Sequence, residues 1–266
     1  MIISKIKFNL ESKRQLLLIS IALSLFAALF FMQPIAQDLA YHHFSDANTL
    51  FSVPNFWNVV SNLPFLFIGI IGLALLAKGT PKGGMSELRM AYITFFIGLI
   101  ITGTGSSYYH LDPNNASLVW DRLPMTISFM GLFIALLVEN VPDFNEKPAL
   151  PIAVLLGLSS VIYWHYLDDL RFYGFMQFTP LVAIPFILYA FKGRYTHRVY
   201  LSYGLLFYIL AKVFELTDRL IFEQTGQLFS GHTIKHLLAA AATYCIYLML
   251  KQRQPINRVS QEIPSN

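Results

Sequence analysis

Eight separate apolar stretches, each with few or no charged residues, constrain this chain more than any other feature of its sequence. They lie at about 15–34, 56–77, 88–110, 118–139, 149–165, 172–191, 199–221 and 232–250. An α-helix of about 20 residues crosses the roughly 30 Å of hydrocarbon in a bilayer. Charged residues make up only 13% of the chain, whereas a soluble domain carries about 25%. The predicted fold class is therefore an all-α polytopic membrane protein.

The first apolar stretch lies close to the N-terminus, where a cleaved signal peptide is the alternative to a membrane helix. Its apolar core is longer than the roughly 7–15 residues usual in signal peptides, so we expect a retained helix. The gaps between the stretches leave no room for a soluble domain. We therefore expect an N-terminus with one helix over 1–36, an outer loop or lid over 37–55, a helical core over 56–250 and a tail over 251–266.

The basic residues of the loops divide unequally between the two sides of the membrane. With the N-terminus inside, the outer side holds only Arg122, Arg171 and Arg219. The positive-inside rule then makes both termini cytoplasmic, which requires an even number of spans. The short loops and this charge bias suggest a bacterial plasma membrane. The net charge is +4, but the basic residues are dispersed among short loops, which argues against nucleic-acid binding. The inner set is Lys5, Lys7, Lys13, Arg14, Lys78, Lys82, Arg89, Lys147, Lys192, Arg194, Arg198, Lys251, Arg253 and Arg258.

Polar residues from three distant stretches come to one depth of the outer leaflet in this topology. His110 ends the third stretch, Asp121 begins the fourth, and His232 and His236 begin the eighth. His232 and His236 are four residues apart and so share one face of a helix. Ser106 lies one turn deeper than His110 on the same face. Ionisable residues inside membrane spans are costly and usually functional, so these positions are candidates for a site.

This residue set suits a catalytic zinc ion. Such sites use three protein ligands, leave a fourth position for water, and lower the pKa of that water to about 7. The single cysteine, Cys245, excludes an internal disulfide and a cysteine-based zinc site. Asp121 can take the proton of the water, and Ser106 can donate a hydrogen bond to an oxyanion.

Four motifs in order resemble those of the alkaline ceramidase family. They are "NFWNVVSN" (55–62), "GTGSSYYH" (103–110), "WDRLPM" (120–125) and "SGHTIKH" (230–236). The resemblance covers about 41–250, and "FWNxxSN" favours the ceramidase branch of a wider group that includes adiponectin-type receptors and haemolysin III proteins. It implies a seven-helix core, to which this chain adds one N-terminal helix.

The resemblance also implies residue roles and an activity. His110, His232 and His236 would bind zinc, with Ser106 and Asp121 as catalytic partners. The expected activity is zinc-dependent hydrolysis of the N-acyl amide bond of a ceramide-like lipid within the membrane. The expected partners are the bilayer and this lipid, with no nucleic acid.

Calcium is a second cofactor that some members of this family hold just before the "FWN" motif. This chain has Asn55 where the family has a glutamate. The preceding stretch offers Asp46 and Asn48 as ligands, and possible further ligands are Asp38 or the pair His42 and His43. A divalent ion would bind such a weakly charged set poorly. We expect segment 37–55 to act as an outer lid instead.

Two other functional classes compete with hydrolysis. A non-enzymatic receptor-like or pore-like protein would use the same histidines for a structural zinc, but it would need neither Ser106 nor Asp121 beside an open position. A transporter would carry buried ion pairs, and the lack of an internal repeat argues against it.

Several other polar and aromatic residues have simpler interpretations. Lys212 and Glu215 predict a buried ion pair or, as a second interpretation, a role in a substrate cavity, and Asp218 has no assigned role. We expect Lys235 to point off the histidine face, towards the interface or a carboxylate. Ser61 and Asn62 suit helix-packing hydrogen bonds, and Trp57, Trp120 and Trp164 suit an aromatic belt.

Overall fold

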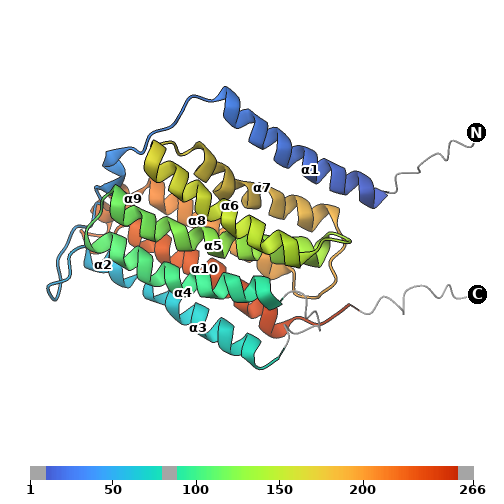
Figure 1. Cartoon of the computed structure of the whole chain (residues 1–266). Helices are drawn as coiled ribbons and strands as arrows, with labels where there is room; N and C mark the ends of the chain where they lie inside the picture. Colours follow the sequence, from blue (N-terminus) through green and yellow to red (C-terminus); the bar gives the residue numbers. More distant parts are fainter. Residues whose placement is uncertain (1–9, 80–88, 257–266) are drawn as a thin grey trace, which may run out of the picture.

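A computed structural model describes residues 10–79 and 89–256 of the chain, and these residues fold as a bundle of helices (Figure 1). Over these two ranges the only β contacts are isolated bridges. The helices are α1 (Leu10–Ala28), η1 (Leu29–Phe31), η2 (Leu39–His42), α2 (Phe56–Val60), α3 (Leu63–Ala77), α4 (Arg89–Leu111), α5 (Asn115–Asn140), α6 (Glu146–Leu167), α7 (Arg171–Ala190), α8 (Val199–Leu216), α9 (Asp218–Gln224) and α10 (Gly231–Gln252).

The eight predicted spans are confirmed as eight helices long and apolar enough to cross a membrane. The chain is thus an all-α, multi-pass integral membrane protein. The start of α1 and the end of α10 lie at the same end of the bundle, as an even number of spans requires (Figure 1). The orientation in the membrane stays a prediction, and part of the basic set behind it (Lys5, Lys7, Lys82 and Arg258) lies outside the described residues.

Two predicted spans are interrupted. The span at 56–77 breaks at Ser61 and Asn62, between α2 and α3. Pro64 follows this break, and a proline has no amide hydrogen and clashes with the carbonyl four residues earlier. The span expected at 199–221 ends at Leu216, and the chain continues as the short helix α9 after Thr217.

Helix α5 is the centre of the bundle and packs against α4, α6 and α7. Close approach depends on small residues, as is common between membrane helices. A side chain at Gly131 of α5 would meet the backbone of Ala91 and Phe95 in α4. On the other side, α10 packs against α8 and α3.

Helix α1 lies outside the bundle, as the predicted extra helix. It contacts α7, and none of its apolar window is buried (Figure 1). Arg171 anchors the chain that follows α1. Its guanidinium donates hydrogen bonds to the carbonyls of Leu29 and Met32 at 3.0 and 2.6 Å. The same guanidinium pairs with Asp169 at 2.7 Å. The amide of Gln37 donates to Asp168 at 2.9 Å, which fixes the start of the 37–55 segment to the loop between α6 and α7.

Candidate metal centre

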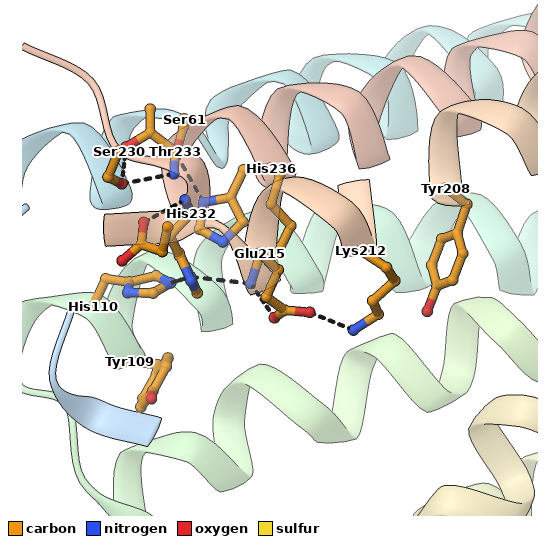
Figure 2. Close-up of polar contacts among 12 residues, drawn as sticks. Ser61, Tyr109, His110, Tyr208, Lys212, Glu215, Ser230, His232, Thr233 and His236 are labelled. Carbon is orange, nitrogen blue, oxygen red and sulfur yellow. Dashed lines mark hydrogen bonds and ion pairs between the residues drawn. The ribbon is translucent and has the colours of Figure 1, made fainter. Parts of the chain in front are cut away.

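Three histidines from two helices converge at one end of the bundle. The start of α1 and the end of α10 lie at the other end (Figure 1). His110 lies in the last turn of α4, and His232 and His236 lie in the first two turns of α10. All three are buried, and one nitrogen of each lies within 4.8 Å of the others. Figure 2 shows the rings turned towards one another. The Nε2 atoms of His110 and His232 are 3.3 Å apart. These three imidazoles can hold a metal ion.

One ring of this cluster is oriented by a further hydrogen bond. The Ser61 hydroxyl lies 2.8 Å from Nδ1 of His236, which leaves Nε2 of that ring for a metal. Metal-binding histidines almost always use their second nitrogen in this way. Nδ1 of His110 is buried and has no hydrogen-bond partner among the described residues. Three neutral nitrogens, with no thiolate beside them, fit zinc.

The start of α10 is built to place its two histidines. Ser230 caps the helix by accepting a hydrogen bond from the amide of Thr233 at 3.1 Å. Asp218 accepts from the amide of His232 at 2.7 Å, so a carboxylate faces the positive end of the helix dipole. A side chain at Gly231 would meet the backbone of Phe214 and of Asp218, so only glycine allows this approach. Asp218, unassigned from the sequence, therefore positions a histidine.

A loop covers the histidines from outside the bundle. The Phe44 ring lies 4.7 Å from the ring of His110 and 4.4 Å from that of His232, measured between centroids. The amide of Ser45 donates to Asp218 at 3.0 Å, and the carbonyl of Asp46 accepts from Asn58 at 3.1 Å. Phe44 was not singled out in the sequence, since a phenylalanine in a loop has no periodicity to mark it.

The residues considered for calcium are used in other contacts. Asn55 donates its side-chain amide to the carbonyl of His110 at 2.8 Å. His42 bonds Tyr109 and Asn115, each at 2.9 Å. Asp46 is fully buried, and burial raises the pKa of its carboxyl above the ordinary value. In the described residues, the only group of three or more His, Cys, Asp or Glu side chains suited to a metal is the histidine cluster.

Ser106 and Asp121 lie beside the cluster, on α4 and α5. Both are buried. Both line the same cavity as His236. The two helices approach closely here because Gly105 lies against the backbone carbonyl of Trp120, where a larger residue would not fit.

An apolar cavity of about 370 Å³ extends from these residues into the bundle. Its volume lies within the roughly 300–1,000 Å³ of small-molecule pockets. Helices α4, α5, α7, α8 and α10 form its wall, mainly through the apolar side chains Phe95, Leu99, Phe129, Phe133, Leu136, Ile184, Leu201, Leu205 and Ile246.

Lys235 departs from its expected position. We predicted that it would point away from the histidine face, but its ammonium lies 3.0 Å from Nε2 of His232. Its flexible four-carbon chain turns the charge back towards the cluster. The expected pairing with a carboxylate is confirmed, since Glu215 lies 3.2 Å away. Glu215 also pairs with Lys212 at 2.7 Å (Figure 2), which confirms the predicted pairing but not its burial, since 38% of the Lys212 side chain is exposed. Both residues line the cavity.

Trp164 does not belong to an aromatic belt, as we had expected. It is buried, and the Arg122 guanidinium lies 4.1 Å from its ring. Trp120, by contrast, is largely exposed, as a belt residue would be. The arginine side chain, not the lipid interface, explains why a large aromatic residue occupies position 164.

Comparison with known proteins identifies a family for most of the chain. A family model described as Ceramidase matches residues 46–262, which includes all three histidines, Ser106 and Asp121. No curated protein matches the chain.

Proposed function

This chain belongs to the ceramidase family, and we propose that it is a zinc-dependent intramembrane hydrolase that cleaves the N-acyl amide bond of a ceramide-like lipid. Membership of the family implies a lipid amide hydrolase. One observation supports the finer proposal: three buried histidines form a cluster, and one of them, His236, lines the same apolar cavity as the buried Ser106 and Asp121.

His110, His232 and His236 would hold the zinc ion. When bound there, zinc would polarise the acyl carbonyl and make water nucleophilic near neutral pH. The three ligands are neutral, and a site of this kind keeps a position open. Ser61 holds the ring of His236 in place for this role.

Asp121 and Ser106 supply the groups that move or stabilise charge. Asp121 accepts a proton from the attacking water and returns it to the nitrogen of the leaving amine. Ser106 donates a hydrogen bond to the carbonyl oxygen as negative charge develops there. Their burial excludes competing bulk water.

The cavity would hold the acyl chain, with the amide at its polar end. We place the site in the outer leaflet of a bacterial plasma membrane, with both termini cytoplasmic. This orientation rests on the distribution of Lys and Arg. A lipid amide lies at the base of its head group, a depth that suits a site near the end of a span.

Metal analysis combined with a panel of N-acyl lipids tests the proposal. Purified protein should contain about one zinc per chain and release fatty acid from at least one lipid. Alanine at His110, His232 or His236 should remove most of the zinc, whereas His165→Ala, which alters an exposed histidine, should not. Stoichiometric zinc without hydrolysis of any lipid would favour the receptor-like or pore-like alternative, in which zinc is structural.

A further inference from the structure

The ammonium of Lys235 lies at the histidine cluster, at a position that the proposed reaction does not use. It is 3.0 Å from Nε2 of His232, and the same Nε2 atom is 3.3 Å from Nε2 of His110. Nε2 is therefore the atom with which His232 faces the cluster. A positive charge thus contacts the nitrogen that His232 would offer to a metal ion.

The contact with Lys235 and a bond to a metal ion require the same electron pair. A lysine ammonium has three N–H donors and no acceptor, so Nε2 of His232 accepts the hydrogen bond with its lone pair. A histidine that binds zinc offers the same lone pair, with the ion about 2.0–2.1 Å from the nitrogen. The two positive charges also repel each other at this range. The two contacts of His232 are therefore mutually exclusive.

Glu215 gives the ammonium of Lys235 a second partner, on helix α8. Its Oε1 atom lies 3.2 Å from the ammonium of Lys235, and its Oε2 atom lies 2.7 Å from that of Lys212 (Figure 2). Each lysine thus has a carboxylate oxygen of its own, and the pair with Lys212 holds the carboxylate in place. The flexible four-carbon stem of Lys235 allows its ammonium to leave His232 and stay on Glu215.

A purely structural role explains only one of the two contacts of Lys235. An ion pair that joins α8 to α10 needs the contact with Glu215 alone, and both side chains are largely buried, with 16% and 17% exposed. The second contact, with His232, adds nothing to that connection between the helices. It places a competing cation on a nitrogen of the candidate metal centre.

We propose that the ammonium of Lys235 holds Nε2 of His232 in the metal-free protein, and that it leaves this nitrogen for Glu215 alone when the metal site fills. This inference rests on the zinc site of the proposed function. Loss of one charge-assisted hydrogen bond opposes metal binding, so Lys235 lowers the affinity for zinc. Lys235 thereby raises the zinc concentration at which the site fills, and Lys212 and Glu215 form the acceptor for its displaced ammonium.

Zinc affinity tests this competition without any turnover. Metal-stripped protein in nanodiscs is titrated with zinc against a chromophoric chelator of known affinity. Lys235→Leu removes the ammonium and adds no ligand atom, so it should bind zinc about 10–100-fold more tightly than the wild type, the scale of one charge-assisted hydrogen bond. Lys251→Leu is the matched control, because it changes an exposed lysine near the other end of α10 and should leave the affinity unchanged. Equal or weaker zinc binding by Lys235→Leu would overturn the inference.

An experimental structure of the zinc-loaded wild type tests the inference without any variant. The ammonium of Lys235 should lie within hydrogen-bond distance of Glu215 and no longer of His232. An ammonium that stays about 3 Å from Nε2 of His232 with zinc bound would overturn the inference.

The zinc titration and a lipid-hydrolysis assay together separate this inference from the hydrolase proposal. Tighter zinc binding by Lys235→Leu without hydrolysis of any lipid by the wild type would support the competition and count against the hydrolase. Unchanged zinc affinity in Lys235→Leu with lipid hydrolysis by the wild type would overturn the competition alone. Zinc that binds neither protein would overturn both.

Discussion

The hydroxyl of Ser61 lies 2.8 Å from Nδ1 of His236, at the point where α2 gives way to α3. The break between these helices thus places a side chain where it can orient a metal ligand. Residues that orient ligands in this way usually contribute about 10–100-fold to metal affinity.

Ser61→Ala should therefore weaken zinc binding by about 10–100-fold while the helical content stays unchanged. Competition with a chelator of known affinity measures this. Ser107→Ala is the matched control, because its hydroxyl donates to the carbonyl of Val59 and contacts none of the histidines. Equal zinc affinity in the two variants would mean that Ser61 only packs the helices, as first expected from the sequence.

The spans and the histidine cluster were predictable from the sequence because both depend on spacing along one helix. Apolar length identifies a membrane helix. The four-residue step from His232 to His236 places both on one face. The position of His110 near these two histidines followed from the topology. Successive spans alternate in direction across the membrane, so the end of the third span and the start of the eighth lie on the same side.

Contacts that depend on helix rotation or on loops were not predictable. A membrane helix is apolar on most faces, so hydropathy does not show which face meets a neighbour, and the burial of Trp164 was missed. Lys235 was misplaced because a long side chain can turn back over its own helix. Phe44 reaches the histidines from a loop, whose course follows from no periodic pattern.

The membrane orientation can be tested with single cysteines in a Cys245→Ser background. We expect an impermeant thiol reagent to label a cysteine at Leu228, between α9 and α10, in intact cells. A cysteine at Lys192, between α7 and α8, should react only after the cells are opened, because the basic loops are expected inside. Both native side chains are exposed, so accessibility depends on the side of the membrane alone. The reverse pattern would move the site to the inner leaflet.

Acid should release the connection between α1 and the bundle. The Arg171 guanidinium lowers the pKa of Asp169 from its ordinary value of 3.8 to about 2. A carboxyl whose pKa is lowered in the folded state stabilises that state at pH values above its ordinary pKa. This stabilisation is lost as the pH falls from about 4 to about 2. The protection of residues 32–37 against hydrogen exchange, corrected for the intrinsic pH dependence of amide exchange, should therefore decrease over this range, since Ile35 donates its amide to Asp169 at 3.3 Å.

Asp169→Asn should show the faster exchange already at pH 6 and lose the acid dependence. Asp143→Asn, at an exposed carboxylate, should behave as the wild type. If the protection factors of residues 32–37 do not change between pH 4 and pH 2 in the wild type, this ion pair does not hold the segment.

Asp121→Asn separates the hydrolase from a protein with a structural zinc. The three histidines are unchanged, and asparagine has nearly the same size and still accepts a hydrogen bond, so zinc content and fold should be retained. Turnover should fall by roughly 10²–10⁴, the range for loss of a general acid–base group. Ser106→Ala should cost on the order of 10²–10³ if it removes one donor to the oxyanion. Asp112→Asn, at an exposed carboxylate near the same end of α4, is the control. Loss of zinc from Asp121→Asn would make the carboxylate a fourth ligand and close the site, and unchanged zinc with unchanged turnover would refute the assigned mechanism.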